Sequence, residues 1–81
     1  MAATTYYARL TPGRTRENPS GVVRRRRAGD TVVDEAFTRN LRWEQTDYFD
    51  RVRLGHNDDE VVEITEVEAQ KFVERVTAKL N

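Results

Sequence analysis

The chain has 81 residues, 37% of them hydrophobic, and its 14 basic and 14 acidic side chains give a net charge of zero. A chain this short forms one domain with a small core and marginal stability. It contains no cysteine, which excludes disulfides, thiolate catalysis and cysteine-based zinc sites. Because it has neither a long apolar run nor the pattern of a signal peptide, we expect a cytoplasmic protein that does not contact a membrane.

The first segments alternate between a strand and a loop. Residues 1–5 are expected to form a loose end, and residues 6–10 a strand with Tyr6, Ala8 and Leu10 on one face. Residues 11–21 contain both prolines and two of the four glycines. This composition predicts a loop that is long for a small domain.

A β-hairpin is predicted next, with strands at residues 22–27 and 32–37 and a tight turn centred on Gly29 and Asp30. That turn would place Arg25 opposite Asp34 and Arg24 opposite Glu35, which are mildly stabilising pairs. Because residues 24–27 carry charge on both faces, we expect an edge strand or a projecting hairpin. A further short extended piece around residues 41–44 follows.

The second half of the chain predicts a helix, a strand and a longer helix. Thr46 would cap a helix over residues 47–54, which Gly55 would end and which would close one end of the sheet. Val61, Val62 and Ile64 are β-formers. Thr65 and Glu68 then form a capping box at the start of the last helix. That helix has an apolar stripe made of Ala69, Phe72, Val73, Val76 and Leu80.

Together these elements predict a single α+β domain over residues 1–81. We expect a small antiparallel sheet in the order β-β-β-α-β-α, with the C-terminal helix packed across one face. The predicted core comprises Leu10, Phe37, Leu41, Trp43, Phe49, Val52, Val61 or Val62, Ile64, Phe72, Val73 and Val76.

Basic residues are concentrated at the front of the chain. Residues 1–27 contain seven arginines and one acidic residue, whereas residues 57–81 contain seven acidic and three basic residues. The candidate binding residues are Arg14, Arg16, Arg24, Arg25, Arg26 and Arg27. An arginine ribbon of this kind can be a solvated surface, can meet an acidic protein partner, or can enter the major groove of a nucleic acid. The alternatives differ in whether these arginines form one continuous positive surface or are neutralised by Asp34, Glu35 and the acidic C-terminal region.

Other patterns do not predict catalysis. His56 lies beside Asp58, Asp59 and Glu60, but their spacing matches neither zinc nor calcium loops, and we interpret the run as a turn. The glycines are isolated, so no phosphate-binding loop is present. The aromatic residues Tyr6, Tyr7, Phe37 and Trp43 could stack on bases, but so short a chain needs them for its core. We therefore expect no enzyme and no cofactor.

Several segments also carry a family resemblance: Tyr6-Tyr7-Ala8-Arg9-Leu10, Val22-Val23-Arg24-Arg25-Arg26, Glu35-Ala36-Phe37 with Leu41-Arg42-Trp43, Thr46-Asp47-Tyr48-Phe49 and Val62-Glu63-Ile64-Thr65-Glu66. With them the chain resembles short uncharacterised proteins of actinobacteria, of the Streptomyces kind. The resemblance implies a bacterial source and a single-domain size, and no site residue. The sequence as a whole favours a protein-interaction or regulatory module, a monomer or homodimer with an unidentified protein partner. A nucleic-acid-binding hairpin is the less favoured alternative.

Overall fold

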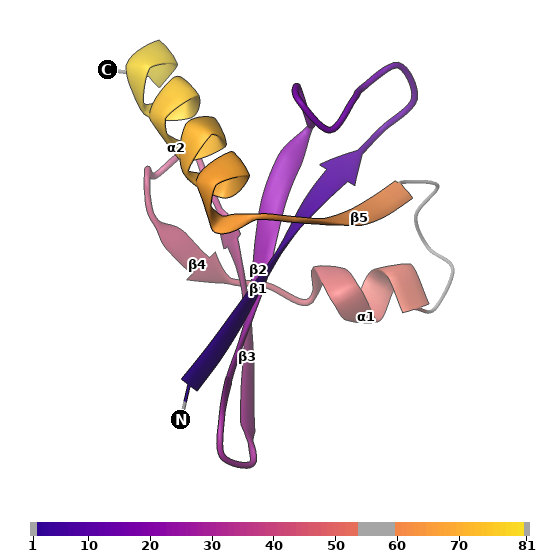
Figure 1. Ribbon diagram of the computed structural model, residues 1–81, viewed down its shortest axis with the longest axis vertical. Helices are drawn as coiled ribbons and strands as arrows, with labels where there is room; N and C mark the ends of the chain where they lie inside the picture. Colours follow the sequence, from indigo (N-terminus) through magenta and orange to yellow (C-terminus); the bar gives the residue numbers. More distant parts are fainter. Residues whose placement is uncertain (1, 54–59, 81) are drawn as a thin grey trace.

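A computed structural model describes residues 2–53 and 60–80, which form a five-stranded sheet and two helices (Figure 1). The element order is β1 (Ala2–Leu10), β2 (Gly21–Ala28), β3 (Thr31–Phe37), β4 (Trp43–Gln45), α1 (Tyr48–Arg53), β5 (Glu60–Ile64) and α2 (Glu66–Leu80). The α+β class and the antiparallel sheet with a C-terminal helix are confirmed. The predicted order β-β-β-α-β-α is wrong by one strand, because Trp43–Gln45 pairs with β3 as β4.

All neighbouring strands run antiparallel in the spatial order β4-β3-β2-β1-β5. β2 is therefore the central strand. Of the two positions that its charge suggested, the edge strand is wrong, whereas the projecting hairpin agrees with the structure. Val22 and Val23 of β2 are buried, one on each face of the sheet, and the charged half of β2 projects beyond them. β1 also differs from expectation: it begins at Ala2 because residues 2–5 pair with the arginine half of β2.

The sheet curls strongly toward the side that α2 covers. In a flat sheet β1 and β4 would lie three strand spacings apart, roughly 14 Å. Yet the ring centroids of Tyr6 on β1 and Trp43 on β4 are only 6.0 Å apart, and Phe37 packs against Trp43 at 5.5 Å. The curled face therefore encloses an aromatic cluster next to the core.

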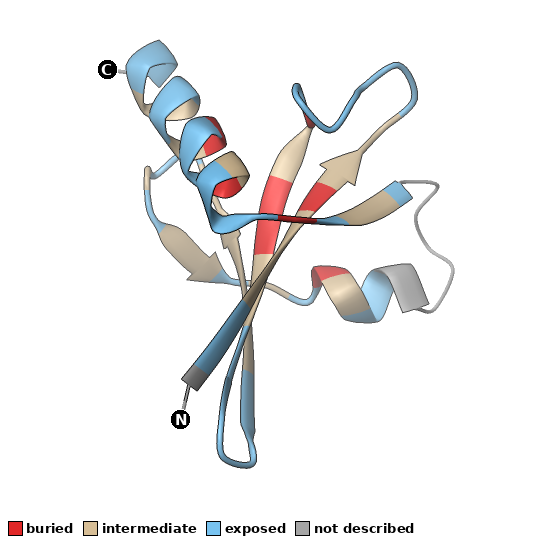
Figure 2. Ribbon diagram, viewed as in Figure 1, coloured by how far each residue is buried: buried red, intermediate tan, exposed pale blue. Residues whose placement is uncertain are grey.

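Helix α2 packs on this curled face, and the predicted capping box starts it. The Thr65 side chain accepts from the Glu68 amide at 3.1 Å, and the Glu68 carboxylate accepts from the Thr65 amide at 2.9 Å. The buried residues gather where α2 meets β1, β2 and β5 (Figure 2). This core consists of Ala8, Val22, Ile64, Ala69 and Phe72, with Tyr6, Leu10, Phe37, Trp43, Val62 and Val76 packed against it.

Helix α1 lies on the other face of the sheet rather than closing its end. Thr46 caps the helix by accepting from the Tyr48 amide at 3.1 Å. Tyr7 points away from the α2 side because side chains alternate along β1, and its ring meets Phe49 at 5.2 Å. Tyr48 and Val23 are buried on this second face. The sheet therefore has a small apolar contact on each side.

The core prediction holds in part. Ile64 and Phe72 are buried as expected, whereas Leu41, Phe49 and Val73 are half-buried. The prediction omitted the buried Ala8, Val22, Val23 and Tyr48. The side chain of Val52, the predicted end of α1 at Gly55, and the His56–Asp58–Asp59 run lie outside the described residues. Neither described helix is long and apolar enough to cross a membrane.

The proline-containing loop between β1 and β2 has a defined path. Its base is joined by a hydrogen bond between the Thr11 and Ser20 hydroxyls, and Thr15 forms an isolated bridge with Asn18. Pro19 is buried, and Arg75 of α2 donates to the carbonyl oxygen of Glu17 at 3.2 Å. The loop is thus attached to α2.

Candidate interaction surface

All of the arginine run except Arg24 lies on a three-stranded projection that we call the arm. The arm comprises residues 2–5 of β1, 25–28 of β2 and 31–34 of β3, and it extends beyond both helices (Figure 1). Gly29 has a φ of 59°, which provides the left-handed conformation that the two-residue turn requires. The predicted register is confirmed: Arg24 lies directly opposite Glu35, and Arg25 opposite Asp34.

Glu35 binds two arginines on the curled face. Its Oε1 accepts from Arg24 Nε at 2.8 Å and from Arg26 Nε at 2.9 Å, and its Oε2 accepts from Arg26 Nη2 at 3.2 Å. The Glu35 side chain is only 12% exposed and that of Arg24 20%. Burial alone would raise the pKa of Glu35, but the hydrogen bonds from the two arginines outweigh it, and the pKa lies below its usual value. Glu35 thus stays charged and neutralises part of the run.

Arg24 is also fixed by an aromatic ring. Its guanidinium carbon lies 4.2 Å from the centroid of the Trp43 ring, within the range of a cation–π interaction. Trp43 itself packs edge-on against Tyr6 and Phe37. Arg24 is therefore enclosed by a carboxylate and an indole, and it has little surface left for an external ligand.

Arg25 is held in the same way on the opposite face. Asp34 accepts from its Nε at 2.8 Å and from its Nη2 at 3.1 Å. The Arg25 guanidinium also lies over the Phe49 ring, with 4.8 Å from its carbon to the centroid. The hydrogen bonds to Asp34 raise the pKa of Arg25. A bidentate pair of this kind is rigid and specific.

The surface that remains open is near the tip of the arm. Arg27 is exposed and has no hydrogen bond or ion pair with another described residue, and Arg26 keeps 49% of its side chain exposed. Val32, opposite Arg27, is 52% exposed. The tip therefore presents one open arginine next to an apolar side chain.

Arg14 and Arg16 do not join this surface. They belong to the β1–β2 loop, which lies at the opposite end of the molecule from the arm (Figure 1). Arg16 donates to both oxygens of Glu68, at 2.7 and 2.8 Å. Arg14 is exposed, and its side chain makes no hydrogen bond or ion pair with other described residues. The six candidate arginines thus fall into two separate groups, and four of the six are ion-paired within the chain.

Glu68 joins the loop to the helix cap, and this arrangement predicts an acid-sensitive contact. Its hydrogen bonds with Arg16, and then with the Thr65 amide, lower its pKa from 4.5 to about 2. A lowered folded-state pKa gives stability that is complete above the unfolded-state value and is lost as pH falls toward 2. We expect the melting temperature to fall with pH between about 4.5 and 2 less steeply in Glu68→Gln than in the wild type.

Circular dichroism melts at successive pH values would measure this dependence. Arg16→Ala removes the largest cause of the shift and should reduce the slope as well. Arg14→Ala, a change in the same loop without a partner, should leave the slope unchanged. An identical slope in Glu68→Gln and the wild type would contradict the assignment.

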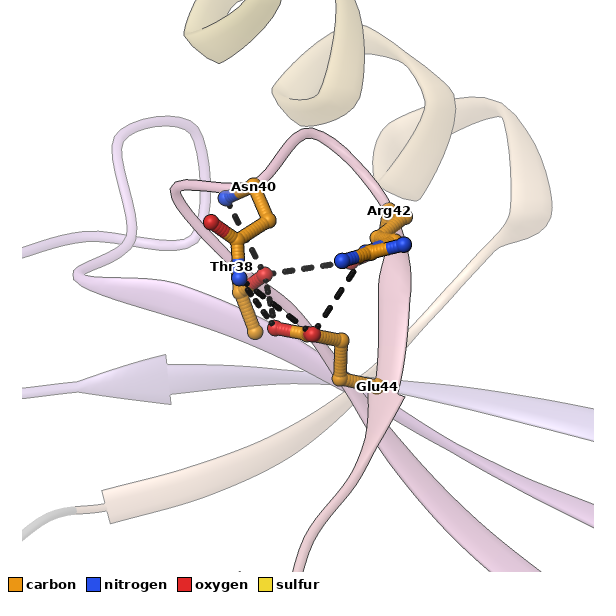
Figure 3. Close-up of polar contacts among 4 residues, drawn as sticks. All are labelled: Thr38, Asn40, Arg42 and Glu44. Atoms are coloured by element: carbon orange, nitrogen blue, oxygen red, sulfur yellow. Dashed lines mark hydrogen bonds and ion pairs between the residues drawn. The ribbon is translucent and has the colours of Figure 1, made fainter.

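The β3–β4 connection is the second structured polar site. The Glu44 carboxylate accepts hydrogen bonds from the Thr38 hydroxyl and, at 3.1 Å, from Asn40 Nδ2 (Figure 3). It also forms an ion pair with Arg42 at 3.5 Å. The hydrogen bond from Thr38, followed by that from Asn40, lowers the pKa of Glu44. These contacts stabilise a turn in which Leu41 has a φ of 59°. A branched aliphatic residue is strained in that left-handed conformation.

The strain at Leu41 predicts opposite effects for two substitutions. Leu41→Asn should raise the free energy of unfolding by about 1 kcal/mol, because asparagine tolerates left-handed backbone. Leu41→Val should lower it, because β-branching increases the clash. Urea denaturation measures both. A loss of stability in Leu41→Asn would mean that contacts of the half-buried Leu41 side chain outweigh the strain.

A mainly apolar cavity of about 230 Å³ lies at the end of the sheet, where β2 and β3 separate. Val22, Phe37, Phe72 and Val76 line it, together with the hydroxyl residues Ser20 and Thr38. Among residues 2–53 and 60–80, no three His, Asp or Glu side chains are placed to hold a metal ion. The cavity is smaller than typical small-molecule sites, which have volumes of roughly 300–1,000 Å³.

Comparison with known proteins gave no match among family models, curated proteins or solved structures. The resemblance to actinobacterial proteins therefore stays a prediction. Sequence reasoning did not identify the Arg16–Glu68 pair or the stacking of Arg24 on Trp43. Both contacts join residues far apart in the chain, so no local pattern could have indicated them.

Proposed function

We propose that this protein is a non-enzymatic interaction module that presents its arm to a protein partner. The observation that carries the proposal is that Arg24, Arg25 and Arg26 are each ion-paired with Asp34 or Glu35. A nucleic-acid-binding ribbon needs several arginines available to phosphates. Protein-binding surfaces, in contrast, combine exposed apolar side chains with a few polar groups, as at Val32 and Arg27.

The shape of the arm also favours a protein partner. It projects from the body as a paired ribbon (Figure 1), and the ion pairs of Asp34 and Glu35 rigidify it. A pre-ordered ribbon loses little conformational entropy on binding. Its location in the bacterial cytoplasm is part of the same proposal.

The alternative is a nucleic-acid-binding arm, which the open Arg27 and the half-exposed Arg26 favour. Two such residues on each ribbon would make few phosphate contacts. Binding of this kind would weaken only modestly as salt rises, with about one unit of logarithmic slope per phosphate.

Site-specific photo-crosslinking in cells tests the proposed function. A benzophenone amino acid at Val32, 52% exposed on the arm, should capture a discrete protein band. The matched control is Leu80, which is 53% exposed at the end of α2 and should capture none. Equal crosslinking patterns from both positions, or crosslinking of Val32 to nucleic acid, would overturn the proposal.

A further inference from the structure

The N-terminal half of β1 has an open edge. β1 pairs with β2 over Ala2–Arg9, but it pairs with β5 only over Tyr6–Leu10. No other described strand lies beside residues 2–5 on the outer side. The same strand is therefore central in the body of the sheet and an edge in the arm.

The direction of the backbone groups on this edge follows from the ladder. The carbonyl oxygen of Arg9 accepts from the Ser20 amide at 2.9 Å, so the polar backbone groups of Arg9 point toward β2. Directions alternate along a strand, and the β1–β2 register continues from Arg9 to Ala2 without a bulge. The N–H and C=O groups of Ala2 and Thr4 consequently point to the open edge.

Among residues 2–53 and 60–80, none of the features that usually prevent pairing with another chain is found at this edge. Natural edge strands carry charged side chains, proline or bulges, or another element covers them. Residues 2–5 are Ala-Ala-Thr-Thr, and β1 contains no bulge in its pairing with β2. An unprotected edge of this composition is suited to strand addition.

The two ends of the open edge have opposite charge. At one end, Glu63 and Glu66 line a polar notch together with Thr4, Thr5 and Tyr6. Neither carboxylate has a hydrogen bond or ion pair with another described residue. Near the other end, Arg27 lies opposite Ala3. Arg27 and Glu63 project from the same face, because Tyr7 pairs with both Val23 and Glu63 and alternate residues of β2 share a face.

We propose that a second copy of this chain adds to this edge, with the two β1 strands antiparallel. Pairing of identical edges is isologous, and its two-fold axis is perpendicular to the sheet. This pairing places corresponding faces of the two sheets on the same side. It also directs the basic end of each copy's edge toward the acidic notch of the other copy. The two arms form one six-stranded sheet, in which Arg27 of each copy approaches Glu63 of its partner. The inference rests on the proposed function only in treating the arm as a protein-facing surface.

Analytical ultracentrifugation of the full chain tests this pairing at loading concentrations from roughly 10 μM to 1 mM. The wild type should show a reversible monomer–dimer equilibrium. Thr4→Pro removes an outward N–H without removing a bond to β2, and it should raise the dimer dissociation constant roughly tenfold or more. The matched variant Thr4→Val retains the N–H and a β-branched side chain, and it should dimerise like the wild type.

Charge exchange provides an independent measurement. Arg27→Glu and Glu63→Arg should each weaken the dimer, because like charges then face one another across the pairing. The double variant should restore the wild-type dissociation constant. Failure of the double variant to recover, with both single variants weakened, would overturn the assigned contact.

A wild type that is monomeric at every concentration would overturn the self-association. Crosslinking of Val32 to a different protein would then leave the proposed function intact, because Val32 lies on β3 at the opposite edge of the arm. A dimer that is equally stable in Thr4→Pro and Thr4→Val would mean that another surface forms it, and would also overturn the inference.

Discussion

Phe72→Ala should lower the free energy of unfolding by about 3–5 kcal/mol, the range measured when a buried phenylalanine is truncated. Phe72 is only 8% exposed and belongs to the core cluster that joins α2 to β1, β2 and β5. At about 0.05–0.15 kcal/mol per residue, a domain of this size has a total stability of roughly 4–12 kcal/mol. The substitution therefore removes a large fraction of it.

Urea denaturation followed by circular dichroism measures this loss. Leu80→Ala is the matched control on the same helix, because Leu80 is 53% exposed, and it should change stability by less than about 0.5 kcal/mol. A loss of under about 1 kcal/mol in Phe72→Ala would contradict the packing of α2 on the sheet.

Glu35→Gln has the second largest expected effect. It removes the negative charge between Arg24 and Arg26 while keeping the shape of the side chain. Hydrogen bonds to charged groups contribute about 1.5–3 kcal/mol, so we expect a loss of about that size. Because the pKa of Glu35 is lowered in the folded state, its contribution is complete at neutral pH and is lost as pH falls through that pKa.

The control for Glu35→Gln is Glu74→Gln on the exposed face of α2, which should be neutral within about 0.5 kcal/mol. Equal stability of the two variants at neutral pH would show that Glu35 does not hold the arginines. At low pH Glu35 of the wild type is protonated. We therefore expect the difference in stability between Glu35→Gln and the wild type to disappear there.

Local signals in the sequence predicted the elements that depend on near neighbours. The hairpin register followed from the Gly29–Asp30 turn, which fixes Arg25 opposite Asp34. The start of α2 followed from Thr65 and Glu68, whose two hydrogen bonds close within one turn. In both cases the residues that determine the geometry are close in the chain.

Non-local pairing could not be predicted in the same way. Charge on both faces of residues 24–27 suggested an edge strand or a projecting hairpin. The hairpin does project, yet β1 and β3 flank β2 on both sides. The strand tolerates this position because acidic residues on β3 pair with Arg24, Arg25 and Arg26. Residues 2–5 carry little apolar pattern, and their order comes from pairing with residues of β2 that are 20 to 26 positions away.

The candidate site was likewise predicted only in its local part. The hairpin arginines and their carboxylate partners were identified, but Arg14 and Arg16 were grouped with them although the loop lies at the other end of the molecule. The aromatic ring over Arg24 belongs to β4, which comes close only because the sheet curls. Curvature of this degree has no signature in a short sequence.

Fluorescence anisotropy with labelled duplex DNA and single-stranded RNA, at about 20 mM and about 200 mM salt, tests the central claim that Arg24, Arg25 and Arg26 are ion-paired within the chain. The account predicts no binding by the wild type at either salt concentration. It also predicts salt-sensitive binding by the double variant Asp34→Asn/Glu35→Gln, in which Arg24, Arg25 and Arg26 lose their charged partners. Tight wild-type binding at low salt that weakens steeply at high salt would contradict the account, because several arginines would then be available to phosphates.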